Sequence, residues 1–488
     1  MNHKLKNLAT PKGRHYILRP LVVAITLSLT ACTLPKDSTL SEVKAVNDVA
    51  YTQAIKDVAQ LDWPSDEWWK RYSDAQLDNL IQEALANAPS MTIAQQRLLQ
   101  AQAFAKQMGA LTKPTVGLAA DASMTKVSYA YQAYMPPEGW NDYGSVGLNF
   151  SYEFDFWGKN RAQVSAAASD FAAAAAEQAS AQIALSTSVA NAYAELARLY
   201  ANLDTVKAAL SVRNQSVDLL QKRFNNGLET QGAVSQAKSA ALSVEAELLS
   251  VQEAIKLQKN AIAALMGQGP DRALMIQRPS VKLSDRFGLP SSLGVGLLGH
   301  RPEITAARWR VESAAQRIGV AKAAFYPNVS LSGFVGYQAY GIDNLANSGN
   351  DAGSIGPAIY LPLFTGGRLE SQLDSANASY EIAVSQYNDS VNRALHEVAN
   401  VVISTKGLAL QISKTEQAVD AARQAHTIAS NRYKGGLATY LDVLSAENAL
   451  INSERALVNL RSKVFSLDLA LVHALGGGFN SHAATDTE

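Results

Sequence analysis

Strictly alternating apolar and polar positions mark two segments in the first half of the chain, which is the pattern of β-strands with one apolar face. The first segment starts near Thr115 and the second ends near Phe156, and a loop with prolines and aromatic residues lies at about 129–143. The apolar face of the second segment consists of Val146, Leu148, Phe150, Tyr152, Phe154 and Phe156. We therefore predict a strand pair at about 115–156.

The same alternation returns later in the chain, at about 328–364. One strand alternates over 329–337 and its partner over 355–363, with a loop rich in Asn, Asp, Gly and Ser between them. Pro357 falls inside the last strand, and a proline in a central strand removes a hydrogen bond of the ladder. The sequence thus predicts a second strand pair but leaves the bounds of its last strand open.

A very long helix is predicted after each strand pair. Residues 160–226 contain neither Gly nor Pro, residues 368–434 contain only Gly407, and each stretch is 67 residues long. At about 1.5 Å per residue, each helix would be ~100 Å long if unbroken. Glycines after both stretches are helix stop signals, so a second helix is expected to return from each turn, to about residues 266 and 475.

The apolar seam of the second long helix predicts nearly straight packing. Its members recur every 3.67 residues on average, whereas a left-handed coiled coil requires a spacing of about 3.5. They are Tyr380, Val384, Tyr387, Val391, Leu395, Val398 and Val402. The first long helix has eleven alanines between Ala162 and Ala181, and these small side chains allow close neighbours on two sides, as the wall of a tube requires. A coiled-coil rod is the alternative that the helix pattern leaves open.

The order of these elements is duplicated along the chain. The segment 223–230 recurs as 432–439 at an offset of 209, and the prolines that bracket 24 residues in the first half recur 213 positions later. A long repeat of this kind means that one supersecondary unit is present twice. We predict a first repeat at 74–275, a linker at 276–300, a second repeat at 301–478 and a tail at 479–488. The first repeat opens with a helical stretch at about 74–111.

The N-terminus resembles a lipoprotein signal. Residues 1–31 carry five Lys and Arg and no acidic residue, and the apolar run 21–29 is too short to span a bilayer stably. The run leads to Leu29-Thr-Ala-Cys32, and Cys32 is the only cysteine. We predict cleavage before Cys32, a diacylglycerol on its thiol, and a lipid-anchored tether and equatorial segment at 32–73. The alternative is a chance cysteine after an ordinary secretory leader.

Composition and motifs argue against other classes of function. The formal net charge is zero for the whole chain and about −5 without residues 1–31, which gives no support to nucleic-acid binding. Gly294-Val-Gly-Leu-Leu-Gly299 matches a dinucleotide-binding fingerprint by letter but lies in the predicted linker, outside a βαβ unit. The histidines are scattered, and nothing resembles a catalytic constellation. We expect no enzyme activity, no metal and no cofactor other than the covalent lipid.

The strands predict an oligomer. No segment after the signal has about 18 uninterrupted apolar residues, so the strands are the remaining route into a bilayer, where only a closed barrel satisfies the backbone. One chain offers four strands, whereas the smallest outer-membrane barrels have about eight. Two chains would give eight strands filled by side chains, and three would give twelve around a lumen. We expect an α+β membrane protein with a shared barrel that is continued by a helical tube.

The sequence resembles the outer-membrane factors of tripartite efflux pumps, the TolC-like family, in its lipoprotein branch. The matching segments follow one another over essentially the whole mature chain: 68–72, 152–158 with Arg161, 301–303, 318–327, 356–364 with 366–368, and 432–444. The resemblance implies a homotrimer with a 12-stranded outer-membrane β-barrel and a 12-helix periplasmic α-barrel. Its implied partners are a periplasmic adaptor protein, an inner-membrane efflux transporter and outer-membrane lipid.

The resemblance also implies a closed constriction at the periplasmic helix tips. The motif carries Asp442 onto an aspartate of this constriction and Tyr433 onto a tyrosine of its gating network. Three-fold symmetry would make Asp442 a ring of carboxylates that favours cations. The alternative is a solvated acid at a helix N-terminus, favoured by the helix dipole. The sequence departs from the family pattern at Ala233, Ala438 and Ser445, so the detailed latch does not carry over.

Three functions are compatible with these patterns. The favoured one is an outer-membrane exit channel that passively conducts drugs from an inner-membrane pump and its adaptor to the exterior. An exit duct for protein secretion belongs to the same class. A lipid-anchored coiled-coil structural protein without a pore is the alternative of a different class.

Overall fold

The computed structural model describes residues 40–43, 53, 59–128, 130, 137–282, 288–290 and 293–481. The leader and Cys32, on which the lipidation prediction rests, lie outside these residues. Contacts divide the chain into two compact units: a sheet-containing unit with residues 103–169 and 312–383, and a helical unit with residues 42–102, 170–311 and 384–488.

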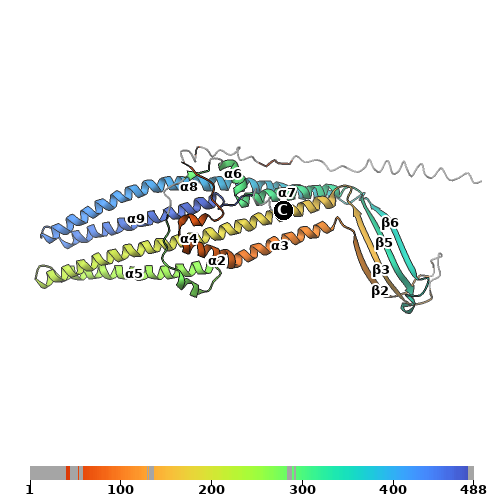
Figure 1. Cartoon of the computed structure of the whole chain (residues 1–488), viewed down its shortest axis with the longest axis horizontal. Helices are drawn as coiled ribbons and strands as arrows, with labels where there is room; N and C mark the ends of the chain where they lie inside the picture. Colours follow the sequence, from red (N-terminus) through yellow and green to blue (C-terminus); the bar gives the residue numbers. More distant parts are fainter. Residues whose placement is uncertain are drawn as a thin grey trace, which may run out of the picture. The chain divides into compact units, whose positions relative to one another are not determined.

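The strands and helices follow the duplicated order (Figure 1). The strands are β1 (Ala59–Gln60), β2 (Thr115–Thr125), β3 (Asn141–Phe154), β4 (Gly288–Leu289), β5 (Asn328–Tyr340) and β6 (Asp351–Tyr360). The α-helices are α2 (Ala75–Asn87), α3 (Pro89–Ala110), α4 (Lys159–Asn225), α5 (Gln231–Leu265), α6 (Leu293–His300), α7 (Pro302–Ala323), α8 (Arg368–Lys434) and α9 (Tyr440–Ala474). The short 3₁₀ helices are η2 (Trp68–Tyr72), η3 (Pro270–Met275) and η4 (Ile342–Asn344).

The four long strands form one antiparallel sheet in the order β2-β3-β5-β6. Its register places the apolar positions of all four strands opposite one another, as in the row that joins Val116, Phe150, Gly333 and Ile355. Residues directly opposite in a ladder share a face, so the two predicted apolar faces are one surface. Several of its side chains are largely exposed: Val116, Leu118, Leu148, Val335, Ile355 and Ile359.

The predicted strand ends are corrected at two places. β3 stops at Phe154, so Phe156 does not belong to the strand face. The reason is Asp155, whose carboxylate accepts hydrogen bonds from the backbone amides of Asn160 and Arg161 at the start of α4. β6 covers Asp351–Tyr360 and includes Pro357; within the sheet of one chain β6 is an edge strand, where proline is found.

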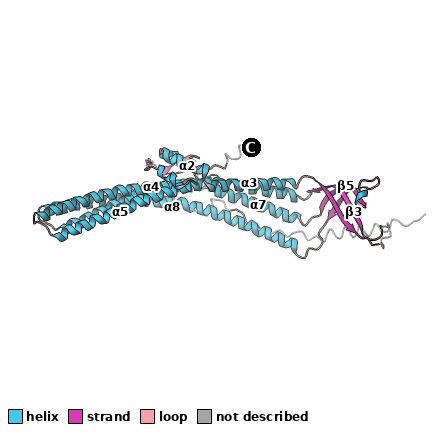
Figure 2. Cartoon of the chain, turned by 90° about the horizontal axis from the view of Figure 1, so that it is seen from below, coloured by secondary structure: helices cyan, strands magenta, loops and turns pink. Residues whose placement is uncertain are grey.

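The two longest helices have the predicted length of 67 residues each. The residues of the predicted seam of α8 are buried from Val384 to Val402. Only Tyr380, the first residue of the seam, is partly exposed. Helix α5 runs back beside α4, as Figures 1 and 2 show, and the Gln258 side chain donates to the Ala192 carbonyl between them. None of the helices in the described part of the chain is long and apolar enough to cross a membrane.

The segment before the first strand pair is not one helix. Ala88 has an extended backbone and separates α2 from α3, because a residue that precedes a proline is disfavoured in the helical region. Trp68 and Trp69 are buried in the core of the helical unit, so they are packing residues. The predicted linker contains α6, so the glycines of its fingerprint-like motif lie in a short helix.

The ends of α5 and α9 pack against the chain at the starts of α3 and α7, respectively. A Cβ added to Gly267 would lie 2.8 Å from Pro89 Cδ, and one added to Gly476 would lie 1.8 Å from the His300 carbonyl oxygen. These two joints occupy equivalent positions in the two repeats. They show that the duplication in the sequence is also a duplication of the contacts.

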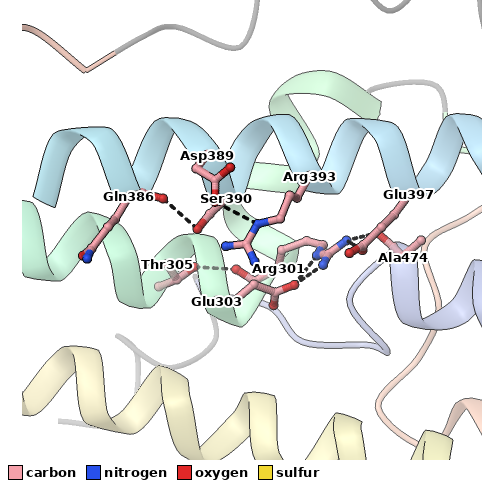
Figure 3. Close-up of polar contacts among 9 residues, drawn as sticks. All are labelled: Arg301, Glu303, Thr305, Gln386, Asp389, Ser390, Arg393, Glu397 and Ala474. Carbon is pink, nitrogen blue, oxygen red and sulfur yellow. Dashed lines mark hydrogen bonds and ion pairs between the residues drawn. The ribbon is translucent and has the colours of Figure 1, made fainter. Parts of the chain in front are cut away.

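The joint of the second repeat has a buried arginine that the first lacks (Figure 3). The Arg301 side chain is only 4% exposed and donates to the carboxylates of Glu303 and Glu397 and to the Ala474 carbonyl at the end of α9. Arg301 therefore connects the starts of α7, the middle of α8 and the end of α9. Ala88 stands at the equivalent position of the first repeat.

Candidate functional site at the helix tips

The two helical hairpins turn in the same way. Gly227 and Gly436 both have a positive φ, of 72° and 74°, and the amides that follow them, of Leu228 and Leu437, donate to the carbonyls of Arg223 and Arg432. This six-residue hydrogen bond is the mark of a glycine-terminated helix end. The repeated sequence therefore produces two matching tips, both in the helical unit.

Tyr433 connects the two tips. Its Oη donates to Glu229 Oε2 at 2.6 Å, which joins the last turn of α8 to the turn between α4 and α5. Its ring is buried, and the Arg223 guanidinium carbon lies 4.7 Å from the ring centroid. Burial raises the pKa of Tyr433, and the hydrogen bond from Tyr433 lowers the pKa of Glu229. At neutral pH the contact is therefore a neutral phenol bound to a carboxylate.

A small apolar core supports this contact. Leu220 and Val234 from the first hairpin pack with Val443 and Leu444 from the second, and Tyr440 meets Tyr433 edge to face at a centroid distance of 6.1 Å. The tips are thus held together by apolar packing as well as by one charged hydrogen bond.

Asp442 has a local role in the described chain. It is the third residue of α9, and its Oδ2 accepts hydrogen bonds from the Thr439 hydroxyl and amide at 2.8 Å each. Thr439 in turn caps the helix, which completes a capping box. These hydrogen bonds lower the pKa of Asp442, so an exposed carboxylate is ionised at neutral pH. Asp442 and Tyr433, which the sequence assigns to one gate, lie in one tip but are not bonded to each other.

Known proteins share the sequence of both repeats. The sequence profile of the outer membrane efflux protein family matches residues 80–268 and 293–477. The chain belongs to this family. The match covers both repeats, so the predicted resemblance and the location in the outer membrane are confirmed.

Three relatives illustrate the similarity of this efflux protein to known members. VceC, an outer membrane protein of Vibrio cholerae, is 64% identical, with a TM-score of 0.81 over 86% of this chain and 100% of VceC. The individual protein that the motifs suggest, the multidrug resistance outer membrane protein MdtP of Escherichia coli, is 29% identical over 472 residues, 94% of this chain and 96% of MdtP. The fusaric acid resistance protein FusA of Burkholderia cepacia is 34% identical over 369 residues, 73% of this chain and 68% of FusA.

Sequence patterns of the efflux protein did not identify Glu229 and Arg223 as partners of Tyr433. The signal was present in the differences between the repeats. Tyr433 replaces Phe224, and Glu229 replaces Ala438, at equivalent positions of the two tips. The second repeat therefore carries the donor, Tyr433, and the first carries the acceptor, Glu229. A search for complementary differences between the two copies would have suggested the pair.

We predict that Tyr433→Phe destabilises the tips by about 1–2 kcal/mol, because it removes a hydrogen bond to a charged group but keeps the ring. Since the folded pKa of Glu229 is lowered, the contribution of this contact is complete at neutral pH. It is lost as the pH falls from the ordinary glutamate value towards the lower folded pKa. Thermal unfolding between pH 3 and pH 7 measures this, in roughly the range where carboxylates titrate.

Glu229→Gln is the matched variant for this prediction. It keeps the shape of the side chain and removes the titrating group, so it should flatten the acid side of the stability profile as Tyr433→Phe does. An acid profile of Tyr433→Phe that is parallel to the parent profile would contradict the assignment.

Proposed function

We propose that three copies of this chain form an outer-membrane exit channel, in which a 12-stranded β-barrel is continued by a 12-helix periplasmic α-barrel. The observation that carries the proposal is the four-stranded sheet. One of its faces is apolar in every strand, and the outer edges of β2 and β6 have no strand partner in the described part of the chain. Open edges in a bilayer require pairing, and copies of the same sheet supply it.

The outermost helices of the hairpins support the same assembly. Helix α5 exposes Leu242, Leu249 and Leu257, and α8 exposes Ile403, Leu410 and Ile428, each set along one face of its helix. Long apolar stripes of this kind are typical of interfaces between copies. A seam between α5 of one copy and α8 of the next would cover both stripes.

The proposed channel passively conducts drugs that an inner-membrane pump and a periplasmic adaptor deliver. The names of MdtP and FusA, which refer to multidrug and fusaric acid resistance, support this class of cargo. A non-conducting coiled-coil rod would leave the apolar sheet face without a role, and a protein-secretion duct has no support among the named relatives.

In this assembly Asp442 contributes a ring of three carboxylates at the tips, and Tyr433 holds the two hairpins of each copy together. Fixed negative charge at a constriction favours cations. The capping box keeps the Asp442 carboxylate ionised and fixes its position at the start of α9.

Purified full-length protein is expected to conduct ions in planar bilayers, with a preference for cations, and Asp442→Asn should reduce this preference. Deletion of the gene should increase susceptibility to a panel of dyes and antibiotics. Absence of conductance together with an unchanged susceptibility across a broad panel would reject the channel.

The lipid anchor on Cys32 belongs to the same proposal. We predict that Cys32→Ala abolishes incorporation of labelled palmitate, because no other cysteine is present in the chain. Continued labelling of the variant would show that the thiol of Cys32 is not the acceptor.

A further inference from the structure

A buried ion pair crosses between the two repeats above the tips. Arg213 on α4 and Glu447 on α9 are 4% and 1% exposed, and the distance from Nη1 to Oε2 is 3.2 Å. Arg213 Nη2 also donates to the Asn448 side chain. The equivalent positions of the other repeat are Ala422 and Lys238, so this pair is specific to the contact between the first and second hairpins.

The pair is poorly supplied with hydrogen bonds. Within the described chain, Nε and Nη1 of Arg213 and both carboxylate oxygens of Glu447 are buried and make no well-aligned hydrogen bond. The pair is therefore a buried ion contact with few well-aligned hydrogen bonds.

The surroundings compensate only in part, through a hydrogen bond between Ser216 and Glu447 and one between Arg213 and Tyr440. Burial raises the pKa of Glu447 and of Tyr440, while burial and the positive charge of Arg213 lower the pKa of His426 on α8. A positive charge on His426 is therefore disfavoured, and Lys434 adds to this effect.

Such a pair favours one alignment of the two helices over other packed alignments, but it does not make the packed state more stable than the separated state. Removing one partner of a buried pair leaves an uncompensated charge and is strongly destabilising, whereas replacing both by apolar groups is often neutral or stabilising. The reason is that both ions lose their hydration when they are buried, and unmade hydrogen bonds leave that loss only partly offset. If α4 and α9 separate, both ions regain water.

We propose that Arg213 and Glu447 form a conformational switch that fixes the register of α9 against α4 in the packed state and lowers the free energy needed to separate the two hairpins. This proposal rests on the proposed channel function, because its expected consequence is opening of the tips. The switch acts beside the Tyr433–Glu229 contact, which is partly buried and favours the packed state.

The test compares four variants of the full-length protein by open probability in planar bilayers and by hydrogen exchange of the first turns of α9. Arg213→Met and Glu447→Leu should each raise the open probability and the exchange rate roughly 100-fold, because each leaves a buried unpaired charge. The double variant should lower both below the parent values, by roughly fivefold or more. The charge-exchanged variant Arg213→Glu/Glu447→Arg should fall between the single variants and the parent.

A matched control is the exposed pair Arg423–Glu454, which joins α8 to α9 at 3.0 Å. Arg423→Met with Glu454→Leu should leave both measurements near the parent values, because exposed pairs contribute little. A double Arg213/Glu447 variant that opens and exchanges as readily as the single variants would overturn the switch, since the pair would then be only a stabilising contact.

The two measurements separate this proposal from the channel itself. If the parent conducts and the double variant opens more easily, the switch is wrong and the channel stands. If no variant conducts, the channel is wrong, and the order of the exchange rates still decides whether burial of the pair opposes packing of α9 on α4.

Discussion

Gly476→Ala is expected to destabilise the protein by about 3–5 kcal/mol, in the range of the most severe single substitutions. The added Cβ would lie 1.8 Å from the His300 carbonyl oxygen, a backbone atom that cannot move without shifting the start of α7. The φ of Gly476 is also 85°, a region that costs other residues roughly 1–2 kcal/mol. Thermal or urea unfolding of the solubilised protein measures the loss.

The same substitution should have the opposite effect at Gly407. This glycine lies inside α8, where an added Cβ meets only the Gln411 side chain at 4.0 Å. Alanine loses less backbone entropy on folding, so Gly407→Ala is expected to stabilise by about 0.5–1 kcal/mol. Gly267→Ala should fall between the two, because its nearest obstacle is Pro89 Cδ at 2.8 Å. Equal effects on stability at Gly476 and Gly407 would contradict the claim that the His300 carbonyl leaves no room for a side chain at position 476.

Much of the fold follows from local patterns. The 67-residue helices are readable because no proline interrupts them and glycines end them. The strands are readable because a sheet with one apolar face repeats every second residue. The end of β3 could not be predicted in this way. The apolar alternation continues to Phe156, but the carboxylate of Asp155 already accepts hydrogen bonds from the start of α4.

The contacts between the repeats were not predictable in the same way. Tyr433 and Glu229 are 204 positions apart, and each looks like an ordinary helix-end residue in its own segment. Asp442 was recognisable from the motif, but its capping box is a local arrangement that is compatible with either role. Arg213 and Glu447 lie inside long helices, where an isolated charge is usually solvated, and only the packing of α4 against α9 makes the pair buried.

Arg301→Met is expected to destabilise the second joint by about 2–4 kcal/mol. Its removal leaves Glu303 and Glu397 without their cation and the last carbonyl of α9 without a donor. Loss of one partner of a buried pair costs about 3–5 kcal/mol, and water recovers part of this because the two carboxylates are 37% and 43% exposed. Arg301→Lys should be intermediate, since a single ammonium cannot reproduce the planar fork of the guanidinium.

Arg393 offers the matched control, because Figure 3 places it on the neighbouring turn of α8, where it pairs with Asp389 at 3.0 Å. Both members of that pair are more than half exposed, so Arg393→Met should change stability by less than about 1 kcal/mol. The first repeat supplies a stricter test, since Ala88, Ser90 and Ser188 stand where the second has Arg301, Glu303 and Glu397. Exchanging all three residues of the second joint for those of the first should recover most of the stability that Arg301→Met loses, because no buried or half-buried charge is then left unpaired. A triple variant as unstable as Arg301→Met would show that packing of the arginine stem, and not its charge, holds the joint.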